Sequence, residues 1–245
     1  MSRIVIYLLS MLLCLGSSAL QGEPVRSLTF PLSRIPQLQH KPEGEVKSMM
    51  KPPLLVNHFT VLIDPGHGGH DAGTQSITKP RYQEKSLNLV TAKFVKEFLQ
   101  QLGYTVFMTR EEDKFVSLDK RIKIANEMKP TIFVSIHYNA APSSEAQGIE
   151  VFYFFSKEDD KGRVSKSKHL AHSILKNVVH MTKGNSRGVK HGNFFVIRQT
   201  TMPAILVEGG FVTNTAEMEK LKDPVYLKRL AWGIVMGIEE YLTNL

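Results

Sequence analysis

The chain has 245 residues, of which 42% are hydrophobic and 22% charged, which fits a globular protein of one or two domains and excludes a disordered chain. Its 31 Lys and Arg exceed its 23 Asp and Glu, giving a formal net charge of +8 at pH 7. A basic chain favours an anionic partner such as a wall or membrane surface.

Residues 1–19 have the pattern of a secretory signal. Arg3 precedes an apolar run that ends in small residues, and we expect cleavage after about Ala19. A membrane anchor is disfavoured because the run is shorter than the roughly 20 apolar residues that span a bilayer. Lipidation at Cys14 is the minority alternative, since Leu13 precedes it where a lipoprotein site has a small residue. We therefore expect an exported, periplasmic protein.

Cleavage would also remove the only cysteine, so the mature chain can form no disulfide and no thiolate metal site. Any catalytic metal must then be bound by His, Asp or Glu. Export argues against nucleic acid as the partner, and the chain has no arginine-rich arm of the kind that binds it.

Residues 20–57 have the composition of a tether. They hold half of the twelve prolines and show no period of 2 or 3.6 residues. Because proline fixes φ, we expect an extended, semi-stiff segment that is too short to be a domain. The prolines are Pro24, Pro31, Pro36, Pro42, Pro52 and Pro53.

Short runs rich in β-branched and aromatic residues begin after this tether. Several are almost continuously apolar, as strands covered on both faces are. The predicted strands are 59–63, 104–109, 131–136, 149–155, 194–197 and 204–207.

Helical patterns separate the predicted strands. Residues 84–103 carry apolar side chains at helical spacing and end at Gly103. Ser117 is the expected N-cap of a helix over 117–129, and further helices are expected over 165–181 and 226–242. The spaced positions in the first helix are Leu87, Val90, Phe94, Phe98 and Leu102. Alternating strands and helices predict an α/β fold, with a mostly parallel twisted sheet flanked by helices on both faces, in one domain over 58–245.

Three residues with catalytic or metal-binding side chains follow predicted strands. His67 comes four residues after the predicted strand 59–63. His137 directly follows 131–136, and Glu208 directly follows 204–207. Taken singly, each has an ordinary structural explanation, a core histidine or a turn glutamate. Together they favour a site, because open α/β sheets bind ligands beyond the carboxyl ends of their strands.

Glu84 joins this group through the helix register. It lies three residues before Leu87 and so projects from the inward face at the first turn, where an unpaired carboxylate is costly. A stabilising interaction with the helix dipole is the alternative. Two imidazoles and one carboxylate form a ligand set of catalytic zinc, which activates water and polarises a carbonyl. Glu208 would then suit the role of general base.

The chain resembles the zinc-dependent N-acetylmuramoyl-L-alanine amidases, the amidase_3 group, from about Thr60 to Tyr241. The resemblance implies hydrolysis of the amide between the lactyl group of muramic acid and the L-alanine of the stem peptide. It implies one Zn²⁺ held by His67, Glu84 and His137, with Glu208 as the catalytic glutamate. The blocks that carry it are VLIDPGHGGHDAGT, EKSLNL, VFMTREEDKFVSLDKRIKIAN, FVSIHYNA, GIEVFYF and SRGVKHGNFFVIRQTTMPAILVEGGFVTN.

The resemblance has few departures. Glu208 is followed by two glycines where many relatives have Leu-Gly, which would loosen the base slightly, and His70 stands where lysine is common. Division-associated members insert a helix after the second histidine that covers the zinc. Here 140–147 is too short for one, so we predict an open site that needs no activator.

The expected partners are peptidoglycan strands and stem peptides, together with wall-remodelling or division proteins, and we expect a monomer. Asn139, Arg110 and His191 are candidate substrate contacts. Arg110 would bind a stem-peptide carboxylate or pair with an acidic side chain, and the sequence leaves both open. Asp64 is expected to orient its loop, and His169 with His172 to lie on a solvated helix face.

Three rival functions remain open. Ser-x-x-Lys, the motif of penicillin-sensitive enzymes, would support an added D,D-carboxypeptidase activity, although five occurrences in a lysine-rich chain are a weak signal. A zinc carboxypeptidase lacks its usual His-x-x-Glu here, and a non-catalytic wall-binding protein would not need all four site positions. The serines of the motif are Ser48, Ser76, Ser117, Ser165 and Ser173.

Overall fold

The computed structural model describes residues 59–158 and 160–245. The predicted signal over 1–19 and tether over 20–57 lie outside the described residues, so both stay predictions. Within the described part of the chain, no helix has the length and apolar character needed to cross a membrane.

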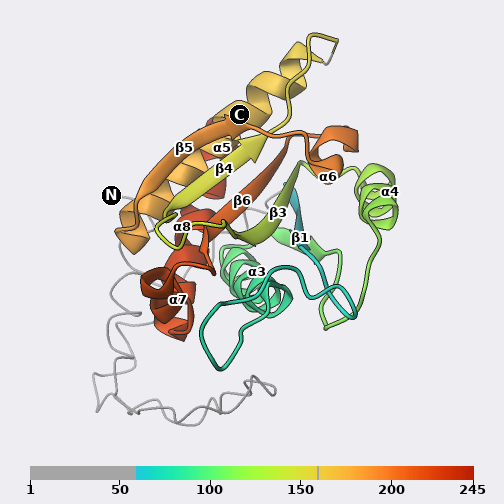
Figure 1. The fold of residues 1–245 in the computed structure, drawn as a ribbon. Helices are drawn as coiled ribbons and strands as arrows, with labels where there is room; N and C mark the ends of the chain where they lie inside the picture. Colours follow the sequence, from blue (N-terminus) through green and yellow to red (C-terminus); the bar gives the residue numbers. More distant parts are fainter. Residues whose placement is uncertain (1–58, 159) are drawn as a thin grey trace, which may run out of the picture. The chain divides into compact units, whose positions relative to one another are not determined.

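Six strands form one sheet in the order β2-β1-β3-β6-β4-β5 (Figure 1). All neighbouring pairs are parallel except β4 with β6, so the predicted mostly parallel sheet is confirmed. The strands are β1 Thr60–Pro65, β2 Thr105–Met108, β3 Ile132–Asn139, β4 Ile149–Tyr153, β5 Ser186–His191 and β6 Ala204–Phe211.

Helices cover both faces of the sheet, as predicted. On one face α3, α5 and α8 contribute to the larger apolar cluster, and on the other α4 and α6 contribute to a smaller one (Figure 1). The helices are α3 Glu84–Gln101, α4 Leu118–Met128, α5 Lys161–Thr182, α6 Phe195–Gln199, α7 Thr215–Leu221 and α8 Pro224–Leu242. The Ser117 side chain caps α4 by accepting the Lys120 amide, which confirms that prediction.

The face that carries the smaller cluster becomes polar toward the carboxyl ends of its strands. Leu62, Phe133 and Leu206 belong to the apolar cluster. Because side chains alternate along a strand, positions two or four residues further on share this face. Those positions hold Asp64, Ser135, His137 and Glu208. The sheet therefore presents a polar row where the sequence predicts a site.

The inward face of α3 is rotated from the predicted stripe. Val90 and Phe94 are only partly buried, whereas Asn88, Thr91 and Val95 are fully buried. The helix accommodates these polar residues because they have partners: Asn88 donates to the Gly66 carbonyl and Thr91 bonds to the Tyr138 hydroxyl at 2.6 Å.

One element prediction is wrong, and one strand was not predicted. Residues 194–197 were expected to be a strand but lie in α6 and its N-cap, where Val196 and Ile197 pack into the smaller cluster. A four-residue apolar run does not distinguish a strand from a helical turn. The stretch Ser186–His191, which carries no apolar run, forms the edge strand β5.

Candidate metal centre

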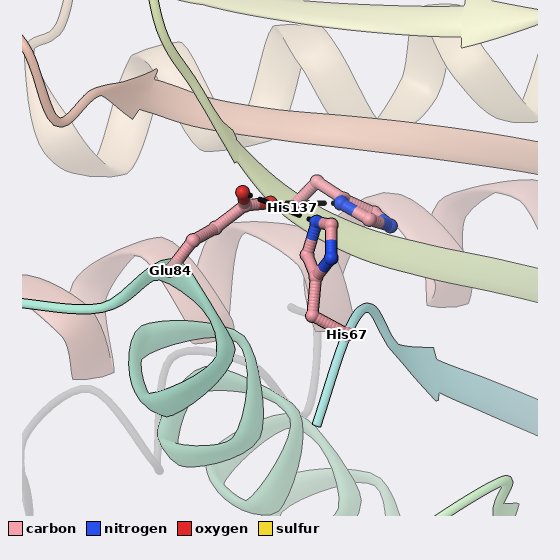
Figure 2. A group of neighbouring side chains, drawn as sticks. All are labelled: His67, Glu84 and His137. Carbon is pink, nitrogen blue, oxygen red and sulfur yellow. Dashed lines mark hydrogen bonds and ion pairs between the residues drawn. The ribbon is translucent and has the colours of Figure 1, made fainter. Parts of the chain in front are cut away.

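Three side chains from distant parts of the chain point toward one another at the carboxyl edge of the sheet (Figure 2). His67 lies in the loop after β1, Glu84 is the first residue of α3, and His137 lies near the end of β3. His67 Nε2 is 3.2 Å from Glu84 Oε2, and His137 Nδ1 is 2.8 Å from Glu84 Oε1. One atom from each residue lies within 4.8 Å of the others, so the predicted grouping is present.

Two buried arginines hold the loop that carries His67. Arg110 donates to the carbonyl oxygens of Pro65 and Gly66, at 3.0 and 2.7 Å. Arg121 donates to those of Pro65 and His67, at 2.8 and 2.7 Å. His67 has φ of 59°, an unfavourable conformation for a residue with a Cβ atom, and these four hydrogen bonds maintain it.

Glycines allow the backbone to approach the ligands closely. A Cβ atom at Gly66 would lie 2.0 Å from the His137 ring, and one at Gly73 would lie 2.6 Å from Glu84 Oε2. Gly73 also has φ of 63°. The glycine-rich stretch therefore serves the packing of the three side chains and is more than a flexible turn.

Asp64 stabilises the loop, as expected. It does not belong to the ligand group, the name used here for His67, Glu84 and His137 together. Its carboxylate accepts hydrogen bonds from Thr109 and Arg121, both at 2.6 Å, and from Ser135 at 2.9 Å. Burial alone would raise the pKa of Asp64, but the Arg121 charge and these hydrogen bonds outweigh burial and lower it. The carboxylate thus stays ionised and fixes the strand end.

The ligand group is electrostatically coupled. Burial opposes the charged forms of both Glu84 and His67. The hydrogen bonds and charges of His137 and His67 outweigh burial at Glu84 and lower its pKa strongly. In return, the hydrogen bond and charge of Glu84 outweigh burial and raise the pKa of His67. An ionised carboxylate that faces two imidazole nitrogens is the donor set of a three-ligand zinc site. The side chains therefore fit a divalent metal ion.

Glu208 lies beside this group on β6, directly opposite His137 of β3 in the strand register. It is 9% exposed, and its Oε2 has no hydrogen-bond partner among the described residues. Burial, and then the charges of Glu84 and Glu150, raise the pKa of Glu208 well above that of an ordinary glutamate. A carboxylate of raised basicity, free to accept a proton, is suited to general-base chemistry.

The segment after Glu208 is held by a buried carboxylate. Glu217 accepts the backbone N–H groups of Phe211 and Gly148, at 2.7 and 2.9 Å. Gly210 has φ of 138°, and a Cβ atom at Gly209 would lie 2.7 Å from the Tyr138 ring. Both glycines are therefore required by the local geometry, whereas the expected loosening of the base stays a prediction.

The candidate substrate contacts have other partners. Arg110 is 1% exposed, and all of its described hydrogen bonds are donated to backbone carbonyls, so it holds the loop and forms no described hydrogen bond with an acidic side chain. His191 is the last residue of β5, and its ring bonds to the Tyr153 hydroxyl. Tyr153 pairs with Ile205, three positions before Glu208, so His191 lies about 10 Å from the site along the strands. Asn139 does lie at the site edge, where it donates to Glu150 at 2.6 Å.

The remaining histidines lie outside the ligand group. The His70 ring contacts the exposed Phe115 ring in a tilted arrangement, with the centroids 4.1 Å apart. His169 and His172 are exposed on α5, as expected. Of the Ser-x-x-Lys serines, Ser117 caps α4 and Ser76 accepts the Tyr82 amide.

Sequence reasoning did not identify several polar residues at this edge: Asp71, Glu150, Arg187 and Lys190. Two signals were present. Asp71 follows His67 by four residues within the glycine-rich loop, and Glu150 interrupts an otherwise apolar strand. A charged residue within a buried strand requires a partner, which is itself a signal of a polar network.

No helix lies between Asn139 and Ile149, as predicted from the short connection. The loop is held instead by side chains. Asn214 donates to the Ser144 carbonyl at 2.7 Å, and Thr213 accepts the Ala141 amide at 3.1 Å.

We expect Asp71→Ala to lower the affinity for a divalent ion about 10- to 100-fold. Asp71 Oδ2 lies 2.9 Å from His67 Nδ1 and so directs Nε2 toward Glu84; partners of this kind orient metal-binding histidines. Competition against a chromogenic zinc chelator would measure the change. Asp119→Ala, at an exposed position of α4, serves as the control. Equal affinity in the two variants would refute the orienting role.

Comparison with known proteins supports the inference from the geometry. Residues 61–240 match the family model described as N-acetylmuramoyl-L-alanine amidase. A relative from Staphylococcus epidermidis, described as "Probable cell wall amidase LytH", is 35% identical over 185 residues, which cover 76% of this chain and 59% of that protein. The chain thus spans somewhat over half the length of such curated relatives.

Solved structures show the same fold. The catalytic domain of the amidase CwlV from Bacillus (Paenibacillus) polymyxa var. colistinus is 39% identical with a TM-score of 0.69, over 76% of this chain and 98% of that one. An N-acetylmuramoyl-L-alanine amidase from Clostridium difficile 630 is 40% identical with a TM-score of 0.70, over 76% and 97%. The described α/β domain therefore corresponds to nearly the whole of both chains.

Proposed function

This chain belongs to the N-acetylmuramoyl-L-alanine amidase family, and we propose that it hydrolyses the amide between muramic acid and the L-alanine of the stem peptide in peptidoglycan. One observation carries the proposal: His67, Glu84 and His137 face one another beside the carboxylate of Glu208, one oxygen of which has no hydrogen-bond partner in the described part of the chain. A wall-binding protein without activity would not need a buried base next to a metal-binding group.

Zn²⁺ held by His67, Glu84 and His137 would supply Lewis-acid chemistry, polarising the amide carbonyl and activating water. Glu208 accepts the proton of the attacking water and then donates it to the nitrogen of the departing L-alanine. Its raised pKa suits both steps, because a more basic carboxylate accepts the proton more readily and its protonated form is then available as the acid.

The residues around the site keep these groups in place. Asp71 orients His67, and Arg110 and Arg121 fix the loop backbone. Preorganisation of this kind lowers the barrier because little has to move when the substrate binds.

We further propose that the protein acts outside the cytoplasm, in wall remodelling or septum splitting. The signal-like pattern of residues 1–19 and the excess of basic residues support this location. The short 140–148 connection supports activity without an activator that uncovers the site.

Digestion of purified peptidoglycan by the purified protein, with Zn²⁺ and no added activator, tests the proposal. Mass spectrometry should detect free stem peptides with an exposed L-alanine amine and glycan strands without peptide. Stem peptides that stay attached to the glycan but are shortened at their carboxyl end would instead support the D,D-carboxypeptidase alternative. Absence of any cleavage under these conditions would contradict the proposal of an activator-independent amidase.

A further inference from the structure

The polar row of the sheet continues past Glu208 to a second buried glutamate. Glu208 of β6 is paired with His137 of β3 on one side and with Glu150 of β4 on the other. Glu150 shares its face with Phe152, which packs against the smaller apolar cluster. Metal ligand, base and second carboxylate therefore stand side by side on three adjacent strands.

Glu150 differs from Glu208 because its charge is compensated. Its Oε1 accepts from Asn139 at 2.6 Å, and its Oε2 accepts from Arg187 at 2.9 Å and from Lys190. These bonds and charges outweigh burial and lower the pKa of Glu150. The carboxylate thus anchors two cations beside the site.

A break in the strand register directs Arg187 toward Glu150. Ile149 pairs with Ser186 but Glu150 pairs with Gly188, so Arg187 is an extra residue in β5. Bulges of this kind re-aim side chains and are common next to active sites. The Arg187 guanidinium also lies 4.9 Å from the centroid of the Phe211 ring, within the range of a cation–π contact.

Both cations remain accessible. The Arg187 and Lys190 side chains are 37% and 39% exposed, whereas that of Glu150 is 5% exposed. Among the contacts described, Lys190 has Glu150 as its one hydrogen-bond partner, although an ammonium group can donate three. Two positive charges against one negative leave this group with a net charge of +1.

The other cations that border the ligand group are already engaged. Arg110 and Arg121 are buried and donate to loop carbonyls. Lys85 donates to the Gly69 carbonyl and to Asp113. At the edge formed by β4 and β5, in contrast, charged donors are left available for a ligand.

We propose that Lys190, together with Arg187, binds a carboxylate of the stem peptide on the leaving-group side of the scissile amide. This inference rests on the proposed function. Strands are about 4.8 Å apart, so Glu150 lies about 10 Å from His137, and an extended peptide covers this distance in about three residues. The stem peptide then runs across β6 and β4, and the glycan lies on the side of the His67 loop.

Two soluble muramyl tripeptides test this assignment, one with a free carboxylate on the third stem residue and one with that group amidated. We expect the wild-type protein to show about 10- to 100-fold higher kcat/KM for the free acid, the usual range for a charge-assisted hydrogen bond. Lys190→Ala should raise KM for the free acid by a similar factor, leave kcat nearly unchanged, and hardly alter cleavage of the amidated substrate.

Lys190→Arg should retain most of the preference, and Lys166→Ala, at an exposed position of α5, should have no effect. Equal wild-type kcat/KM for the two substrates would overturn the inference and needs no variant to fold. An equal loss on both substrates in Lys190→Ala would also overturn it, by showing that Lys190 only neutralises Glu150. If the wild-type protein released stem peptide from neither substrate nor whole peptidoglycan, the proposed function would fail as well.

Discussion

Glu208→Ala should lower kcat for release of stem peptides by about 10³-fold, within the range that loss of a general acid–base group produces. Glu208 is buried, its pKa is raised, and no other described carboxylate beside the ligand group is free of compensating cations. Water would have to replace it as the proton acceptor. Quantifying released peptides by chromatography would measure the loss.

Glu208→Gln is the matched variant, because it keeps the shape of the side chain and removes its basicity. Both variants should retain one bound metal ion per chain and the circular dichroism spectrum of the wild type. If either variant digested the wall at the wild-type rate, Glu208 would not be the general base. The protein would then use a different base or act only by binding.

His137→Ala should abolish both metal binding and activity, with a loss of at least about 10³-fold that added Zn²⁺ does not reverse. The wild-type protein should lose activity to a chelator and recover it with Zn²⁺. The wild type and the variant should differ because His137 would supply one of the three proposed protein ligands, and Gly66 and Glu84 are packed around its ring.

Metal binding also has a readout that is independent of catalysis. Zn²⁺ at about 100 times its dissociation constant should stabilise the folded wild-type protein by about 2.7 kcal/mol, which thermal unfolding detects. His137→Ala should show no such shift, and Glu208→Ala should show the full one. Zinc-dependent stabilisation of His137→Ala equal to that of the wild type would place the ion elsewhere.

The sequence was sufficient to predict the sheet and the ligand group, for identifiable physical reasons. Apolar runs that end in His67, His137 and Glu208 correspond to parallel strands, and parallel strands place their carboxyl ends at one edge. Glu84 was predicted from helix periodicity, which fixes the direction of a side chain to within one face. Both signals depend on local geometry, which repeats from one protein to another.

The local sequence pattern was insufficient to predict features that depend on contacts between residues distant in the chain. The run 194–197 is equally compatible with a strand and a helix, and its packing against the smaller cluster decided for a helix. The edge strand β5 has no apolar run because its side chains are exposed or only partly buried. Arg110 and His191 have the chemistry of substrate contacts, but Arg110 is enclosed by backbone carbonyls and His191 lies at the opposite end of its strand.

The sequence alone predicts the α/β class, the candidate metal ligands and the candidate base, because strand alternation and helix periodicity act over a few residues. Only the tertiary structure decided which charges remain available to a substrate. That depends on pairing between strands far apart in the chain: Glu150 is placed next to Glu208 by an antiparallel register, and a bulge in β5 brings Arg187 to it. Whether a cation is available to a substrate depends on its neighbours in space, and the local pattern of residues does not encode these neighbours.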